Sequence, residues 1–265
     1  MTRAERFPGT LPWSEERDAE GRRNIAVLLA YDGTGFLGFQ RQAQTPTIQQ
    51  VVEDGLERLL KHPVRITPAG RTDAGVHACG QVFNFRTGAR IPTARVPAAL
   101  NSVLPPTVVA QGAASVPPDF SARRSARGRV YYYLMAMAPY PSPFTRRFSW
   151  HYPWPLDVAA MNEAARALRG THDFRSFCVD AAAQRSTVRE VFWVRCRLRR
   201  DMLVTVVRAN AFLRGMVRAI VGTLVDVGRG KLAPESVAGI LAARDRAAAG
   251  AAAPPGGLCL ARVDY

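Results

Sequence analysis

Residues 70–78 read GRTDAGVHA and contain the side chains of this chain that are best suited to chemistry. Glycine on either side of Arg71, Thr72 and Asp73 allows the backbone to turn sharply and to present the Asp73 carboxylate outward. A carboxylate aimed in this way can act as a nucleophile or as a general base. The alternative is that Asp73 caps a turn and Arg71 is a surface cation, and for one aspartate in a glycine-rich loop the residue types alone favour this alternative.

Arg218 could supply a positive charge to such a carboxylate. A helix over residues 212–227 would place Arg214, Arg218 and Arg229 on one stripe, with apolar residues on the buried arc. A carboxylate that acts as a nucleophile or base must be ionised at neutral pH, and a nearby cation favours its charged form. For Arg218, a phosphate contact or a solvated face is an equally good interpretation of the pattern.

Tyr131 is the aromatic side chain that could meet a bound base. It lies in a predicted strand where Arg129, Tyr133 and Met135 share its face, because alternate residues of a strand point the same way. An ordinary core tyrosine is the alternative, and that interpretation is the better one for Tyr132 and Tyr133.

The elements that carry these residues follow from the hydrophobic pattern. In the first half, an apolar run at residues 24–31 ends at an Asp-Gly pair and predicts a buried strand. Thr47 and Gln50 form a capping box before a helix over residues 48–61. The other elements predicted in this half are strands at 64–67, 81–85 and 108–114 and a helix at 92–104.

In the second half, strand-forming residues at 130–137 precede a helix that Asp157 caps and that runs to Gly170. An antiparallel hairpin is predicted from alternating residues, with three arginines on one face. The remaining predicted elements are the hairpin strands 190–198 and 203–210, helices at 212–227 and 234–244, and a strand at 258–263.

Hairpins mixed with helical crossovers predict an α+β fold rather than a doubly wound parallel sheet. The order of elements begins to repeat, which predicts two similar α/β halves at 24–118 and 119–265, after a flexible leader at 1–23. The chain contains no glycine-rich nucleotide-binding motif, so we expect no nucleotide cofactor.

The charge balance indicates the class of partner. The 265 residues include 36 Lys and Arg against 21 Asp and Glu, a formal net charge of +15, which favours a polyanion such as nucleic acid. Arginine in place of lysine can reflect a coding bias, but such a bias does not raise the net charge. Four scattered cysteines and the absence of a long apolar stretch or signal peptide predict a reduced, cytoplasmic protein. The four histidines show no ligand spacing, so no metal site is expected.

The loop at residues 70–78 resembles the signature loop of the TruA-type tRNA pseudouridine synthases. Nine consecutive residues of this composition are a highly specific match. Other segments resemble the same family, in the family's order, from about residue 24 to the end. They are residues 31–33, 36, 38–42, 47–49, 119–123, 129–133, 173–177, 209–222 and 257–265.

The resemblance implies a continuous, mainly antiparallel sheet with helices on one side, and isomerisation of uridine to pseudouridine in tRNA without cofactor or metal. Asp73 matches the family's catalytic aspartate, and Arg218 matches a cation paired with it. Tyr131 matches the tyrosine that stacks on the target uracil, and Arg71 an arginine that helps to guide the base as it leaves the helix. Extruding that nucleotide costs about a few kcal/mol.

The resemblance also implies a homodimer that grips tRNA, with uridines 38 to 40 of the anticodon arm as targets. Clustered arginines would hold the RNA phosphates, although a solvated charged strand is the alternative for some of them. These residues are Arg123, Arg124, Arg127, Arg129, Arg195, Arg197 and Arg199.

Two other functions fit parts of the sequence. A non-catalytic RNA-binding module of the same fold would be expected to lack the Asp73 loop, which is intact here. A metal-dependent phosphoesterase built on Asp73 and His77 would need further carboxylate and histidine ligands. We interpret His77 as a structural residue bonded to the backbone. The chain departs from the family at residues 178–187, at Cys79 and in its leader, which affects local RNA contacts rather than the catalytic assignment.

Overall fold

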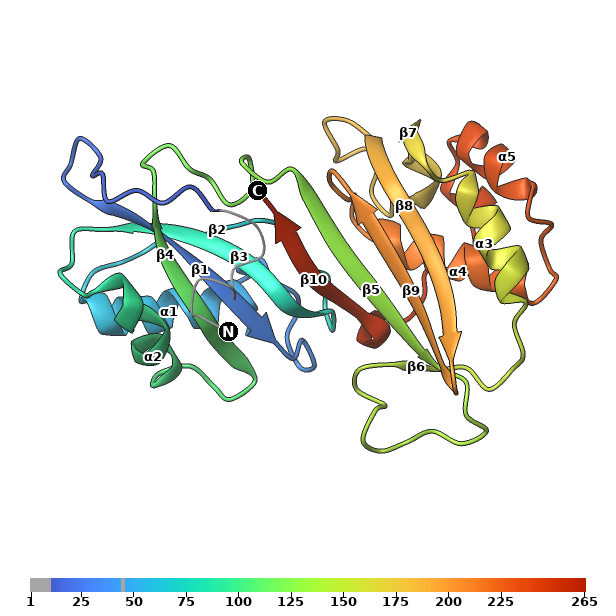
Figure 1. Ribbon diagram of the computed structural model, residues 1–265, viewed down its shortest axis with the longest axis horizontal. Helices are drawn as coiled ribbons and strands as arrows, with labels where there is room; N and C mark the ends of the chain where they lie inside the picture. Colours follow the sequence, from blue (N-terminus) through green and yellow to red (C-terminus); the bar gives the residue numbers. More distant parts are fainter. Residues whose placement is uncertain (1–10, 44–45) are drawn as a thin grey trace. The chain divides into compact units, whose positions relative to one another are not determined.

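The computed structural model describes residues 11–43 and 46–265, which form two compact units (Figure 1). The first unit comprises Met1–Arg127 and Leu260–Tyr265, and the second comprises Gly128–Cys259. The division thus falls later than the sequence pattern suggests, and the end of the chain returns to the first unit. Hydrogen bonds explain the difference, because residues just after 118 bond to the first unit: the amide N–H of Ala122 donates to Asn84 (2.8 Å).

The first unit is built on β1 (Arg23–Tyr31), whose apolar residues are almost all buried. It pairs antiparallel with β3 (His77–Thr87) on one side and with β4 (Val108–Val116) on the other. β2 (Thr67–Pro68) and β10 (Leu258–Asp264) lie next to β3, so the strand order in this unit is β4-β1-β3-β10. The buried strand predicted at the start of this half is confirmed, and β3 is longer than expected.

Two helices belong to the first unit. α1 (Ile48–Leu60) begins as the capping box predicts, because the Thr47 hydroxyl accepts a hydrogen bond from the Gln50 N–H at 3.3 Å. α2 (Val96–Asn101) packs on β4, after a single 3₁₀ turn, η2 (Thr93–Arg95). It is shorter than the helix predicted at 92–104. The α-helix starts only next to the proline in its first turn, and it ends at Asn101.

The second unit has its own antiparallel strands. In sheet order they are β5 (Gly128–Ala136), β9 (Met202–Ala209), β8 (Val188–Arg199) and β7 (Gly170–Asp173). A short strand, β6 (Trp150–His151), pairs parallel with β5. β8 and β9 form the predicted hairpin. The predicted alternation is confirmed at Val194 and Cys196, which are buried while the arginines beside them are exposed, but it fails at Leu198, which is 45% exposed at the end of the strand.

The helices of this unit pack on one another and on β8. α3 (Val158–Arg166) contacts β8 and α4 (Met216–Gly228), and α5 (Ser236–Ala243) contacts α3. The predicted cap is confirmed, because the Asp157 carboxylate accepts from the third residue of α3 at 2.9 Å. α4 begins later than predicted, because Gly215 precedes it with a φ of 71° in the left-handed region. Arg214 is therefore not on the helical stripe.

A mainly antiparallel arrangement of strands with five α-helices, counted over the residues that the structure describes, confirms the predicted α+β class. None of the helices in these residues combines the length and apolarity that a membrane span requires.

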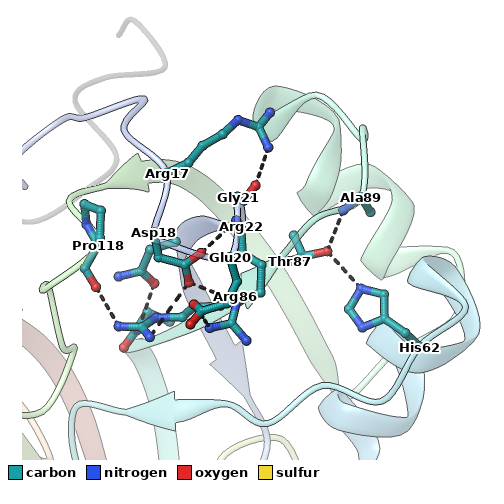
Figure 2. A network of polar contacts seen from close by, with 12 residues as sticks. Arg17, Asp18, Glu20, Gly21, Arg22, His62, Arg86, Thr87, Ala89 and Pro118 are labelled. Carbon is teal, nitrogen blue, oxygen red and sulfur yellow. Dashed lines mark hydrogen bonds and ion pairs between the residues drawn. The ribbon is translucent and has the colours of Figure 1, made fainter.

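The segment before β1 makes defined contacts (Figure 2). Leu11 is buried, and Asp18 accepts hydrogen bonds from the amide and the guanidinium of Arg22 at 2.8 and 2.9 Å. Arg86 of β3 lies 3.9 Å from the same carboxylate and donates to the Pro118 carbonyl at 2.7 Å. Residues 11–23 thus fold onto the first unit, whereas residues 1–10 of the expected leader lie outside the described part of the chain.

Candidate active site

Asp73 lies in the turn that connects β2 to β3. The amide N–H of Val76 donates to the Asp73 carbonyl at 3.1 Å and closes a four-residue turn. Gly75 occupies its third position with a φ of 74°, a conformation that glycine adopts without steric cost. The Asp73 side chain is half-buried and Arg71, two residues earlier, is exposed. The turn therefore holds the Asp73 carboxylate on the first unit, where it is only partly exposed to solvent.

Polar contacts hold both sides of this turn. The hydroxyls of Tyr31 and Thr72 lie 2.8 Å apart in a buried hydrogen bond. The Gln81 side-chain amide donates to the Gly70 carbonyl at 2.8 Å, and the Phe39 N–H donates to the Thr72 carbonyl at 3.0 Å. After Asp73, the Gly75 N–H donates to the Phe36 carbonyl at 3.3 Å, so both sides of the turn are tied to the end of β1, to β3 or to the segment that follows β1.

Two glycines let the segment after β1 approach the turn closely. A Cβ atom on Gly33 would lie 2.1 Å from the Val76 carbonyl oxygen, and one on Gly38 would lie 2.9 Å from the Thr72 carbonyl oxygen. Gly38 also has a φ of 84°. Any side chain at Gly33 would overlap backbone, so the position of the turn depends on glycine there.

His77 is buried at the start of β3. Its Nδ1 accepts a hydrogen bond from the Gly33 N–H at 3.0 Å and lies 3.2 Å from an Asp32 carboxylate oxygen. The predicted hydrogen bond between His77 and the backbone is confirmed. Across the described residues, no group of three or more His, Cys, Asp or Glu side chains could hold a metal ion.

Tyr131 and Arg218 belong to the second unit. Tyr131 is buried in β5, and its ring meets Phe212 edge-on, with the centroids 5.1 Å apart. Arg218, in the first turn of α4, donates from Nε to the Ala253 carbonyl at 2.7 Å. Phe212 lies shortly before α4, and Arg218 lies in the first turn of α4. The contacts of Tyr131 and of Arg218 are therefore both made within the second unit.

The guanidinium of Arg218 also acts on Tyr133. The Tyr133 hydroxyl donates to the Pro254 carbonyl at 2.8 Å, next to the Ala253 carbonyl that Arg218 binds. Burial raises the pKa of the Tyr133 phenol strongly, and the positive charge of Arg218 opposes part of that rise. Tyr133 therefore stays protonated at neutral pH and serves as a fixed donor, in keeping with its interpretation as a core tyrosine.

The expected phosphate-binding arginines divide into two groups. Arg129 is buried and donates to the Asn210 carbonyl, so it supports the fold rather than offering its charge to RNA. The others are exposed, and Arg195 is stacked over Trp193 at 5.9 Å from the ring centroid. A second cation–π pair joins Arg208 to Phe192 at 5.1 Å. The exposed arginines are Arg123, Arg124, Arg127, Arg195, Arg197 and Arg199.

The contacts that hold the Asp73 turn against the end of β1, the segment after β1 and β3 are here named the frame of the turn. They were not predicted together from the sequence. Residues 31–33 and 38–42 were recognised only as matching segments, because Tyr31 and Thr72 are 41 positions apart. Two features of the sequence indicate the frame of the turn. Two glycines follow soon after an apolar strand, and a glutamine, Gln81, is buried within another apolar strand.

Comparison with known proteins identifies the family. A family model described as tRNA pseudouridine synthase matches residues 27–123 and 164–265. Proteins named tRNA pseudouridine synthase A are similar along almost their whole length. The protein of Moorella thermoacetica is 48% identical, over 91% of this chain and 99% of its own length. Those of Geobacter sulfurreducens and Caldicellulosiruptor bescii are 46% and 41% identical, each over 92% of this chain and 100% of its own length.

A solved structure, a chain of a Cbf5-Nop10-Gar1 complex, aligns with a TM-score of 0.34 and 13% identity, over 76% of this chain and 45% of that one. The sequence relatives and the family model identify the family of this chain. The chain belongs to the tRNA pseudouridine synthase family, whose members are isomerases.

Proposed function

We propose that this enzyme converts uridine to pseudouridine in the anticodon arm of tRNA, at positions 38, 39 and 40, with Asp73 as the nucleophile. The observation that carries the proposal is the fixed, half-buried turn that presents Asp73 in a chain of this family. The enzyme is proposed to act in the cytoplasm as a homodimer, without cofactor or metal.

In the proposed reaction, an Asp73 carboxylate oxygen attacks C1′ of the ribose and the bond from C1′ to N1 breaks, with its electron pair leaving on the uracil. The uracil rotates, C5 bonds to C1′, and the carboxylate leaves. N1 then gains a proton and the proton on C5 is lost, so the product has the same composition as the substrate. Because C1′ is inaccessible in a stacked strand, the nucleotide must first be extruded.

Three other residues have proposed roles in this reaction. Arg71, exposed beside the turn, is proposed to guide the extruded nucleotide. Tyr131 is proposed to stack on the uracil and to assist loss of the C5 proton. Arg218 is proposed to favour the ionised form of the Asp73 carboxylate, as a cation does for any nearby carboxylate.

The proposed positions are tested with tRNA transcripts in which a single anticodon-arm uridine is kept at position 38, 39 or 40. Purified enzyme is incubated with each, and pseudouridine is mapped at nucleotide resolution. We expect product at the retained position and none at uridines elsewhere. Product found only outside the anticodon arm would refute the proposed target. Tight binding with no product on any transcript would mean that this chain binds RNA without acting on it.

Replacing Arg218 tests its proposed electrostatic role. We expect Arg218→Ala to lower kcat by about 10²-fold to 10³-fold, the scale on which loss of one preorganised electrostatic contact acts. Arg218→Lys keeps the charge but lacks Nε, and should restore much of the rate. A kcat for Arg218→Ala close to that of wild type, or no difference in kcat between Arg218→Ala and Arg218→Lys, would refute the role.

Tyr31→Phe tests the frame around the Asp73 turn. The change removes the hydroxyl that bonds Thr72 and should lower kcat by roughly 10-fold to 100-fold, since small displacements of a reacting group are costly. It should leave the Kd for tRNA unchanged and lower the free energy of unfolding by about 1 kcal/mol. Tyr265→Phe is the matched control, because that hydroxyl also donates within the first unit, to Ala122 (2.9 Å). A kcat loss as large in the control would show that the effect is merely structural.

A further inference from the structure

The connection between β5 and β6, residues 137–149, exposes large aromatic side chains to an extent that is rare for such residues. Tyr140 is 85% exposed and Phe144 is 90% exposed. Figure 1 shows this connection, here named the aromatic loop, as a long yellow-green segment of the second unit next to β6. Large rings exposed together on one connection indicate a surface that binds another molecule, whereas apolar side chains exposed singly are ordinary.

The aromatic loop is held in a defined shape. Its start is tied by the Met137 N–H, which donates to the Asp201 carbonyl at 2.7 Å, and by the Ala138 carbonyl, which lies 2.9 Å from Nε2 of His151. Within the loop, the Arg146 N–H donates to the Ser142 carbonyl at 3.0 Å. Prolines at 139, 141 and 143 restrict the backbone further. A partner would therefore bind rings on a backbone that is already ordered, so binding avoids the entropy cost of ordering the loop.

Charge identifies the partner. The aromatic loop has arginines at 146 and 147, both exposed, and the sequence contains no Asp or Glu from residue 120 to residue 156. Rings interleaved with arginine are the combination that binds single-stranded nucleic acid, because bases stack on the rings while the cations meet phosphates. A second copy of the chain, docked on this surface by a two-fold contact, would instead bring two such cationic loops against each other.

We infer that the aromatic loop is an RNA-binding surface on which Tyr140 and Phe144 stack on unpaired nucleotides of the bound tRNA while Arg146 contacts phosphate. This inference rests on the proposed function only in taking tRNA as the bound substrate. Stacking on rings accepts every base, so the aromatic loop strengthens binding without selecting a sequence.

The test compares the double variant Tyr140→Ala/Phe144→Ala with wild type in binding to an unmodified tRNA transcript at several salt concentrations. We expect Kd to rise by about tenfold per ring lost, in line with the cost of removing a base–aromatic stack. The slope of log Kd against log salt should not change, because stacking releases no counterions. Arg146→Ala should lower that slope by about 1. Tyr140→Trp/Phe144→Trp should bind like wild type.

Trp13→Ala is the matched control, since Trp13 is an aromatic side chain of the first unit that is 65% exposed, and its removal should leave Kd unchanged. A double variant that binds tRNA as tightly as wild type would overturn the inference. So would a change in sedimentation of the RNA-free double variant, which would identify the surface as a contact between copies. Wild type that binds tRNA but forms no pseudouridine would refute the proposed function and leave the aromatic loop to be judged by Kd alone.

Discussion

Asp73→Asn is expected to abolish pseudouridine formation while leaving tRNA binding and folding intact. The asparagine side chain has nearly the same shape but lacks the negative charge and the nucleophilic oxygen pair, so attack on C1′ cannot occur. We expect the single-turnover rate to fall by roughly 10⁴-fold or more, the scale on which loss of an essential catalytic group acts. The rate can be followed by tritium release from tRNA made with [5-³H]uridine, because C5 loses its hydrogen in the reaction.

Binding and stability separate this effect from a trivial one. The hydrogen bond that closes the turn is accepted by the Asp73 backbone carbonyl and is kept in the variant, and the half-buried asparagine has nearly the same shape, so the free energy of unfolding should change by less than about 1 kcal/mol. The Kd for tRNA should stay close to that of wild type. Asp73→Ala should behave in the same way. Substantial turnover by either variant would exclude Asp73 as the nucleophile.

Gly33→Ala is expected to have the next largest effect, although residue 33 touches no substrate in the proposed mechanism. The added Cβ would lie 2.1 Å from the Val76 carbonyl oxygen, so the turn or the end of β1 must move by about 1 Å to relieve the overlap. A displacement of that size at a catalytic group costs about 10²-fold in rate. We expect kcat to fall by at least that factor, and the free energy of unfolding to fall by about 1–3 kcal/mol.

Gly35→Ala is the control for this prediction. Gly35 lies two residues further along the same segment with a φ of 82°, and a Cβ there would have no neighbour within 4 Å. It should cost about 1–2 kcal/mol of stability through backbone strain while leaving kcat near that of wild type. If the two variants lose stability and activity in parallel, the close approach of Gly33 to the turn does not position Asp73.

Local sequence signals predicted most elements of the fold correctly. The apolar run of β1, the capping box of α1 and the alternation in β8 each depend on residues close together in the chain. Prediction failed where an element depends on contacts with residues far away in the sequence. β7 and β6 are too short to show a pattern and exist through pairing with β8 and β5. The start of α4 was misplaced because the left-handed conformation of Gly215 is visible only in the structure.

The candidate site shows the same limit. Asp73 and its turn could be singled out from nine consecutive residues because those residues resemble a family's signature loop, whereas the residue types alone favoured an ordinary turn cap. The support of Arg218 by the Ala253 carbonyl joins positions 35 apart and has no sequence signature. Arg129, expected to meet phosphate, is buried instead, because its guanidinium satisfies a carbonyl in the neighbouring part of the second unit.

The most direct test of the proposed function is to incubate the purified enzyme with an unmodified tRNA transcript, without added metal, and to map pseudouridine along the whole RNA. Asp73→Asn, which should bind the RNA equally well, serves as the blank. We predict pseudouridine in the anticodon arm with wild type and none with the variant. Tight binding by wild type with no pseudouridine at any position, or equal product from both proteins, would contradict the account.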